Sequence, residues 1–245
     1  MKIAKYKFIA LFLVPILALM TGGKAVLAWD EGVTVSSDFD NIYYEDAVDF
    51  STTIDAYSGW SSYLLSHNPV PSWYQEESYG GIDDDRADYT ELSLLVCHGA
   101  SGQIAFPSGW IDDPDEVRLG YSSPDSEGYN IWQFFIVCNL FGNSYYSDWL
   151  SSLTGTHMLL GFSSTAVISN VDLDELAHRL TGTGGYSQQT IQDAYFATYV
   201  VDDGCHDDNI CRILAENTSV ADNDDIDTFT YQITVDSTKV IITCP

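Results

Sequence analysis

Three short runs of apolar residues in the middle of the chain constrain its fold more than any other feature. They span Leu92 to Cys97, Ile131 to Cys138 and His157 to Phe162. Each run has the length of a β-strand and is apolar at consecutive positions, so both faces of each strand are predicted to be buried. Such strands are typical of a parallel sheet covered by helices, although short buried helices are an alternative that periodicity alone leaves open.

The segment between the second and third runs favours the parallel sheet. A helix is predicted over residues 144–153, where apolar residues recur at steps of three and four, and Thr154-Gly155 ends the pattern. A strand, a helix and a second strand in this order imply a right-handed crossover between parallel strands.

Helical and turn patterns extend this arrangement on both sides. Further helices are predicted over residues 47–56, from Asn170 or Asp172 to Leu180, and over residues 187–199. Residues 202–227 are interpreted as an acidic loop region, and two β-branched runs, 228–235 and 240–243, predict a terminal hairpin. We therefore expect an α/β fold with a mostly parallel central sheet, helices on both faces and a C-terminal β-hairpin. Residues 29–245 are expected to form a single domain, because no repeat or linker divides them.

The N-terminus has the pattern of a secretory signal peptide. Lys2, Lys5 and Lys7 precede an apolar run over residues 8–20, and Val26-Leu27-Ala28 resembles a cleavage site. The run is shorter than the ~20 residues that span a bilayer. We expect residues 1–28 to be removed and the protein to be secreted, to the medium or the cell surface, with an uncleaved N-terminal anchor as the alternative.

The charge of the chain excludes several classes of partner. The net charge is −27, and removal of the four lysines in residues 1–28 lowers it to −31. A surface this negative repels nucleic acids and anionic lipids, so peptides and metal ions are the better candidates. Lys239 is the one lysine outside residues 1–28, and aspartate outnumbers glutamate 27 to 9. This composition suits a salt-adapted extracellular protein, because salt screens the self-repulsion.

Two chemically reactive side chains follow the first two apolar runs. His98 and Gly99 come at the end of the first run, and Cys138 at the end of the second. Because ligands bind at the carboxyl ends of parallel strands, an imidazole and a thiol here can act as base and nucleophile. The backbone N–H groups of Gly99 and Cys138 are the predicted oxyanion donors.

This pattern resembles the caspase-like clan of cysteine peptidases, which includes caspases, gingipains, clostripain and legumain. The clan has an apolar block ending in His-Gly, as in residues 92–99, and a second block ending in the catalytic cysteine, as in residues 134–138. The resemblance extends toward an uncharacterised prokaryotic branch, through a Trp-containing helix and the stretch over residues 155–163. It covers roughly residues 80–200. The chain departs from the clan's pattern at Cys97 and Val137, where small residues are usual.

The resemblance implies that His98 removes the proton of Cys138, which attacks a peptide carbonyl and forms a thioester that water hydrolyses. It implies no organic cofactor. Acidic surroundings favour substrates with a basic residue at the cleavage position, because a carboxylate pairs well with arginine. The alternative is an inactive surface or binding protein of the same fold, and a third hypothesis is a calcium-dependent structural module.

Five cysteines allow several pairings in a secreted chain. Cys205 and Cys211 are predicted to form a local disulfide. A Cys97–Cys244 bond would leave Cys138 free, whereas a Cys97–Cys138 bond between adjacent strands would block catalysis. Both thiols can also be buried as small apolar groups.

The remaining histidine and acidic groups suggest other sites. His157 is interpreted as a structural histidine, with a place near the crevice as the alternative. Acidic clusters at residues 83–85, 202–203 and 222–227 offer oxygen ligands for calcium, although solvated loops are the default. The group Cys205, His206 and Cys211 lacks zinc-ligand spacing. Motifs of serine hydrolases, zincins, P-loop proteins and dinucleotide-binding proteins do not occur.

Overall fold

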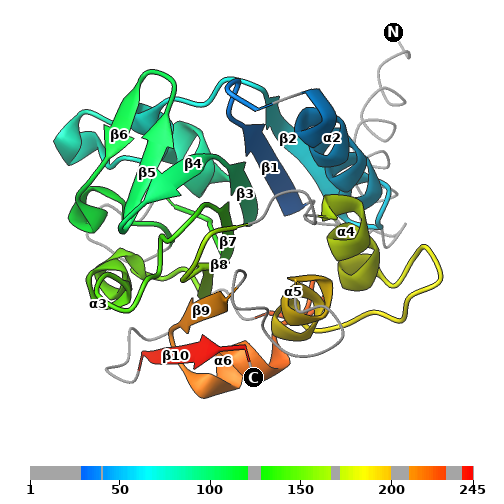
Figure 1. Ribbon diagram of the computed structural model, residues 1–245. Coiled ribbons are helices and arrows are strands. Elements are labelled where there is room, and N and C mark those ends of the chain that lie inside the picture. Colours follow the sequence, from blue (N-terminus) through cyan, green and yellow to red (C-terminus); the bar gives the residue numbers. More distant parts are fainter. Residues whose placement is uncertain are drawn as a thin grey trace, which may run out of the picture.

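A computed structural model describes residues 29–39, 41–120, 128–166, 172–199, 210–229 and 239–244. Seven strands in these ranges form a central sheet in the order β10-β9-β8-β7-β3-β1-β2 (Figure 1). The strands are β1 (Trp29–Val35), β2 (Trp60–Ser66), β3 (Leu92–Val96), β7 (Trp132–Ile136), β8 (Met158–Phe162), β9 (Cys211–Ala215) and β10 (Val240–Thr243). The first five of these are parallel to one another, and β9 is antiparallel to both β8 and β10.

Helices cover both faces of this sheet, as predicted. One face packs against α2 (Asn41–Asp55), α4 (Leu173–Thr181) and α5 (Ile191–Tyr199) (Figure 1). The other face carries α3 (Tyr146–Trp149) and a small antiparallel sheet of β4 (His98–Ala100), β5 (Gln103–Phe106) and β6 (Gly109–Ile111). A further helix, α6 (Thr218–Asn223), follows β9. The α/β class and the mostly parallel sheet are therefore confirmed.

Short 3₁₀ helices fill the connections. They are η1 (Pro71–Trp73), η2 (Glu77–Tyr79), η3 (Asp83–Asp85), η4 (Ala87–Tyr89), η5 (Pro114–Glu116) and η6 (Leu150–Ser152). Four of them lie between β2 and β3, in the region where the sequence showed no long periodic pattern. No helix among the described residues is long and apolar enough to cross a membrane.

The apolar runs supply two separate cores because strand side chains alternate between the faces. In β7, Phe134 and Ile136 belong to the core beneath α2, α4 and α5, whereas Phe135 packs on the opposite side with Trp149 of α3. The two cores explain why these runs carry apolar residues on both faces of the strands.

Local signals set the bounds of α4. The Asp172 side chain caps its N-terminus by accepting a hydrogen bond from the Glu175 N–H at 2.8 Å. Gly182 follows the helix with φ 68°, the left-handed conformation that glycine adopts readily. The predicted helix ending at Leu180 is thus confirmed to within one residue.

Other predicted elements differ in extent. The helix expected over residues 144–153 is a single turn, α3, continued by η6, and α5 begins at Ile191, four residues later than expected. The region interpreted as an acidic loop contains β9 and α6. The charged residue Arg212 makes β9 difficult to recognise as a buried strand in the sequence. In the structure its buried guanidinium is accommodated because it donates to the Phe141 carbonyl and, at 2.9 Å, to Asn143 Oδ1.

The chain terminus contributes an edge strand. β10 pairs antiparallel with β9, with Val240 opposite Ala215. Most of the first arm of the predicted hairpin, residues 228–235, lies outside the described residues, as does the predicted signal peptide over residues 1–28.

Candidate active site

The ends of β3 and β7 bring the two predicted reactive residues to one edge of the sheet. The strands are parallel neighbours, with Val96 opposite Ile136. The Cys97 N–H continues this ladder by donating to the Ile136 carbonyl at 3.3 Å. His98 and Cys138 each come two residues after the end of their strand. They therefore follow at equivalent positions on adjacent strands.

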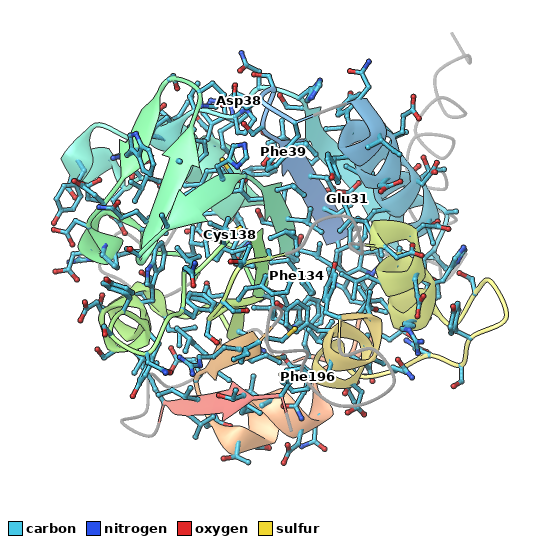
Figure 2. All side chains as sticks on the ribbon, in the orientation of Figure 1. Glu31, Asp38, Phe39, Phe134, Cys138 and Phe196 are labelled. Atoms are coloured by element: carbon cyan, nitrogen blue, oxygen red, sulfur yellow. The ribbon has the colours of Figure 1, made fainter. Side chains whose placement is uncertain are left out.

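Both residues are linked to the core on the same face of the sheet, Cys138 directly and His98 through Phe39. Cys138 and Phe39 pack against the core beneath α2, α4 and α5 (Figure 2). The ring of Phe39 lies 4.3 Å from the imidazole of His98, centroid to centroid, at an interplanar angle of 35°. His98 is exposed and Cys138 is half-buried. Solvent therefore reaches the imidazole, and the thiol lies at the margin of the core.

Gly99 allows the backbone after His98 to lie against the end of β7. A Cβ at this position would be 2.2 Å from Val137 Cγ1 and 3.0 Å from the Cys138 carbonyl oxygen. Gly99 belongs to β4, where it pairs with Ile104, and so it lies in an extended strand. Glycine is required here because of this close approach.

The loop after β7 is held by the loop after β8. The Cys138 thiol donates to the Ala166 carbonyl at 3.6 Å, and the Asn139 N–H donates to the Ser164 carbonyl at 2.7 Å. Asn139 has φ 54°, a left-handed conformation uncommon outside glycine. Within the described part of the chain, the Cys138 N–H makes no backbone hydrogen bond.

The alternative in which Cys97 and Cys138 form a disulfide is wrong, because both are free thiols. Cys97 points into the core opposite the one that Cys138 contacts, and its thiol donates to the Ala105 carbonyl at 2.6 Å. Burial raises the pKa of Cys97 to about 12, so this thiol stays protonated and unreactive at neutral pH.

The predicted Cys205–Cys211 disulfide is also corrected. Cys211 is a free thiol that opens β9 and is buried in the core, where burial raises its pKa to about 12. Its side chain is directed into the core by the strand. Cys205 lies outside the described residues. Cys244 takes part in a disulfide bond, and the other cysteine of this bond lies outside the described residues. The Cys97–Cys244 alternative is excluded, because Cys97 is free.

His157 has the structural role that was predicted. Its Nδ1 forms a buried ion pair with Asp224 Oδ2, which also accepts a hydrogen bond from Trp132 Nε1 at 3.0 Å. His157 precedes β8, so it lies at the amino edge of the sheet, opposite to the edge where Cys138 follows β7.

Sequence reasoning missed Phe39 and Ala166, the residues in contact with His98 and Cys138. Phe39 follows β1, a strand whose sequence contains Asp30, Glu31 and Gly32 and shows no continuous apolar run. The only available signal was the short segment Val33 to Val35.

Known proteins that are similar to this chain include a sequence relative and a solved structure. No family model matches it. An uncharacterised protein of Archaeoglobus fulgidus is 42% identical over 241 residues, which cover 93% of this chain and 90% of that protein. A solved structure of a secreted C11 cysteine protease from Bacteroides thetaiotaomicron, in complex with an irreversible peptide inhibitor, is similar at 8% identity with a TM-score of 0.43. The match covers 77% of this chain and 66% of the protease chain, just under two thirds of its length. The extent and identity of the first match show that the chain belongs to the same family as the Archaeoglobus fulgidus protein.

Proposed function

We propose that the protein is a secreted cysteine endopeptidase in which His98 is the general base and Cys138 the nucleophile. One observation carries the proposal: the two residues follow neighbouring parallel strands at equivalent positions, on the edge where such sheets bind ligands. The exposure of His98 and the free state of Cys138 support it. The pairing of a thiol with an imidazole is the arrangement that cysteine nucleophiles require.

The proposed reaction has two steps. His98 takes the proton of the Cys138 thiol, and the sulfur attacks the scissile carbonyl carbon. The oxyanion accepts hydrogen bonds from the N–H groups of Gly99 and Cys138. His98 then protonates the leaving amine, which departs and leaves a thioester on Cys138. In the second step His98 removes a proton from water, the hydroxide attacks the thioester, and the carboxylic acid product leaves as the thiol is restored.

This reaction requires the thiol to change its partner. In the structure the Cys138 thiol donates to the Ala166 carbonyl, which is a weak base. Substrate binding must therefore favour the rotamer that turns the sulfur toward the imidazole. Because the Cys138 N–H makes no backbone hydrogen bond to the described residues, it could donate to an oxyanion without breaking one.

We further propose a preference for a basic residue at the cleavage position. Asp38 follows β1, the strand next to β3, and its exposed side chain lies near Phe39, the residue whose ring contacts His98 (Figure 2). A carboxylate here would attract an arginine or lysine side chain. A panel of peptides that differ only at this position tests the preference, and equal cleavage of arginine and neutral peptides would contradict it. Asp38→Asn should reduce the cleavage of the arginine peptide selectively.

The dyad itself is tested by labelling and hydrolysis on protein beginning at residue 29. Cys138 should react with iodoacetamide faster than free cysteine at about pH 6, with the label located by mass spectrometry. Cys138→Ala and His98→Ala should each abolish peptide cleavage. His178→Ala, which replaces a half-buried histidine of α4, is the matched control and should retain it. Cleavage that persists without Cys138 would refute the dyad.

The second candidate is an inactive binding protein of the same fold. It is favoured by the hydrogen bond of the Cys138 thiol to Ala166 and by the packing of Phe39 on His98, which occupy both groups. Slow alkylation of Cys138 together with absent cleavage would support this candidate.

N-terminal sequencing of the exported protein checks the proposed cleavage after residue 28.

A further inference from the structure

A group of three carboxylates lies between β2 and β3, apart from the candidate active site. Glu77 belongs to η2, and Asp83 and Asp84 belong to η3. Each residue offers one carboxylate oxygen, and these three oxygens lie within 4.8 Å of one another. Like charges this close repel unless a proton or a cation lies among them.

Asp83 gives the group a feature that solvated acidic loops lack. Its exposed fraction is 1%, and its Oδ1 has no hydrogen-bond partner within the described residues. An ionised carboxylate buried in this way is costly unless it is paired or bound to a metal. The oxygen is therefore available as an inward-facing ligand.

No basic side chain of the described residues forms an ion pair with Asp83. Arg86 is near in sequence, but its guanidinium donates to the Asp85 carbonyl at 3.1 Å and lies over the Trp73 ring at 5.4 Å. A cation from solution would supply the counter-ion that the described residues do not provide to Asp83.

Neighbouring acids strengthen the negative potential. Asp88 is completely buried, and its Oδ1 accepts hydrogen bonds from the N–H groups of Gly120 at 2.6 Å and Asn130 at 3.3 Å. Asp88 and Glu77 are among the acidic groups whose charges act on Asp83.

We propose that Glu77, Asp83 and Asp84 bind a calcium ion that joins η2 to η3. The ligand set contains only oxygen, which suits hard cations and excludes a zinc site of the usual composition. Oxygens within 4.8 Å of one another can all reach one Ca²⁺ ion, whose ligands lie at about 2.3–2.6 Å. Water completes the coordination shell.

The ion would have a structural role. The segment that carries the three acids packs through Tyr74 and Ala87 against the core that also contains Cys97. Cys138 and Phe39 pack against the other core. Calcium would hold the long connection that leads into β3, and the proposal is independent of the peptidase hypothesis.

Isothermal titration with CaCl2 and thermal unfolding, with calcium or with EGTA, test the site on protein beginning at residue 29. Both are run in high salt, because a chain this acidic attracts cations non-specifically. Calcium should bind with a stoichiometry of about one and raise the Tm, since a ligand that binds the native state stabilises it. Asp83→Asn should lose this rise, because the amide that replaces the carboxylate carries no negative charge to bind the ion. Glu77→Gln, at an exposed residue, should weaken binding without affecting folding.

Asp222→Asn is the matched control, because Asp222 is an exposed acid in a different acidic segment. It should leave calcium binding unchanged. The proposal is overturned if the wild type shows no calcium-dependent heat or Tm shift, or if Asp83→Asn and Glu77→Gln both bind calcium as the wild type does. Equal binding of magnesium would overturn the assignment to calcium.

Discussion

Gly99 lies so close to Val137 that a Cβ at residue 99 would be 2.2 Å from Val137 Cγ1. This contact joins the segment after β3 to the segment after β7, the two segments that carry His98 and Cys138. The carbonyl oxygen of Gln103, 2.6 Å from the same Cβ position, closes the space from the other side. The relative position of the two candidate catalytic residues therefore depends on the absence of a side chain at Gly99.

Gly99→Ala should destabilise the protein by about 1–3 kcal/mol, the usual cost of forcing a methyl group into a packed site. Urea unfolding measures this change. Gly109→Ala in β6 is the control, because a Cβ there would meet only Pro71 Cγ at 3.4 Å. Its free energy of unfolding should change by less than about 1 kcal/mol. Equal effects of the two substitutions would show that Gly99 is not constrained by Val137.

The contact between Phe39 and His98 should restrain the imidazole. Phe39→Leu removes the ring contact at 4.3 Å and an edge contact to Tyr43 at 5.4 Å. We expect a lower kcat for peptide cleavage with little change in KM, because the base is less well positioned. Phe196→Leu is the control, since Phe196 packs against the same core beside Tyr195 in α5. If both variants lose the same fraction of kcat, Phe39 acts through general stability.

The pair formed by His157 and Asp224 should contribute to stability and leave the candidate active site unaffected. Asp224→Ala leaves a buried imidazole and the Trp132 Nε1–H without their acceptor, so we expect a loss of about 3–5 kcal/mol. His157→Ala should cost a similar amount, and the double variant should cost less than the sum, because the pair is lost only once. The alkylation rate of Cys138 in the folded variants should stay at the wild-type value. A changed rate would place His157 in the catalytic machinery.

The sequence predicted those parts of the fold in which one residue type dominates locally. β3, β7 and β8 are apolar on both faces, and α4 has a capping aspartate and a terminal glycine, so neither required knowledge of distant partners. β1 was missed because it contains Asp30 and Glu31. Each carboxylate accepts a hydrogen bond from a serine, Ser61 for Asp30 and Ser51 for Glu31, that the chain brings close only on folding.

The candidate site likewise has parts that the sequence predicted and parts that it did not. The positions of His98 and Cys138 follow from the ends of two recognisable strands. Phe39 depends on β1, and the state of Cys211 depends on β9, which Arg212 disguises. To predict which cysteines pair, one must know the direction in which each side chain points. For Cys211 this direction is set by β9, a strand that the sequence did not reveal.

Glu31 should make the stability of the protein depend on pH near neutrality. Its side chain is completely buried in β1, its Oε1 accepts a hydrogen bond from Ser51, and its Oε2 has no hydrogen-bond partner among the described residues. Burial raises the pKa of Glu31 from 4.5 to about 7, and the charges of Asp55 and Asp30 act in the same direction. Between these two values the folded chain holds a proton that the unfolded chain has released.

The free energy of unfolding should therefore fall as the pH rises from about 4.5 to about 7, and the loss should be complete above that range. A shift of this size corresponds to about 3 kcal/mol. Glu31→Gln retains the hydrogen bond from Ser51 and cannot ionise, so its advantage over the wild type should be larger at pH 8 than at pH 5 by this amount. Urea unfolding at both pH values gives the comparison, with Glu45→Gln as an exposed control on α2 that should show no such difference. Because Asp83 and Asp88 also have raised pKa values, the wild-type curve alone is ambiguous, and the difference between Glu31→Gln and the wild type isolates this carboxyl group. A difference that is the same at both pH values would mean that Glu31 does not change its protonation on folding.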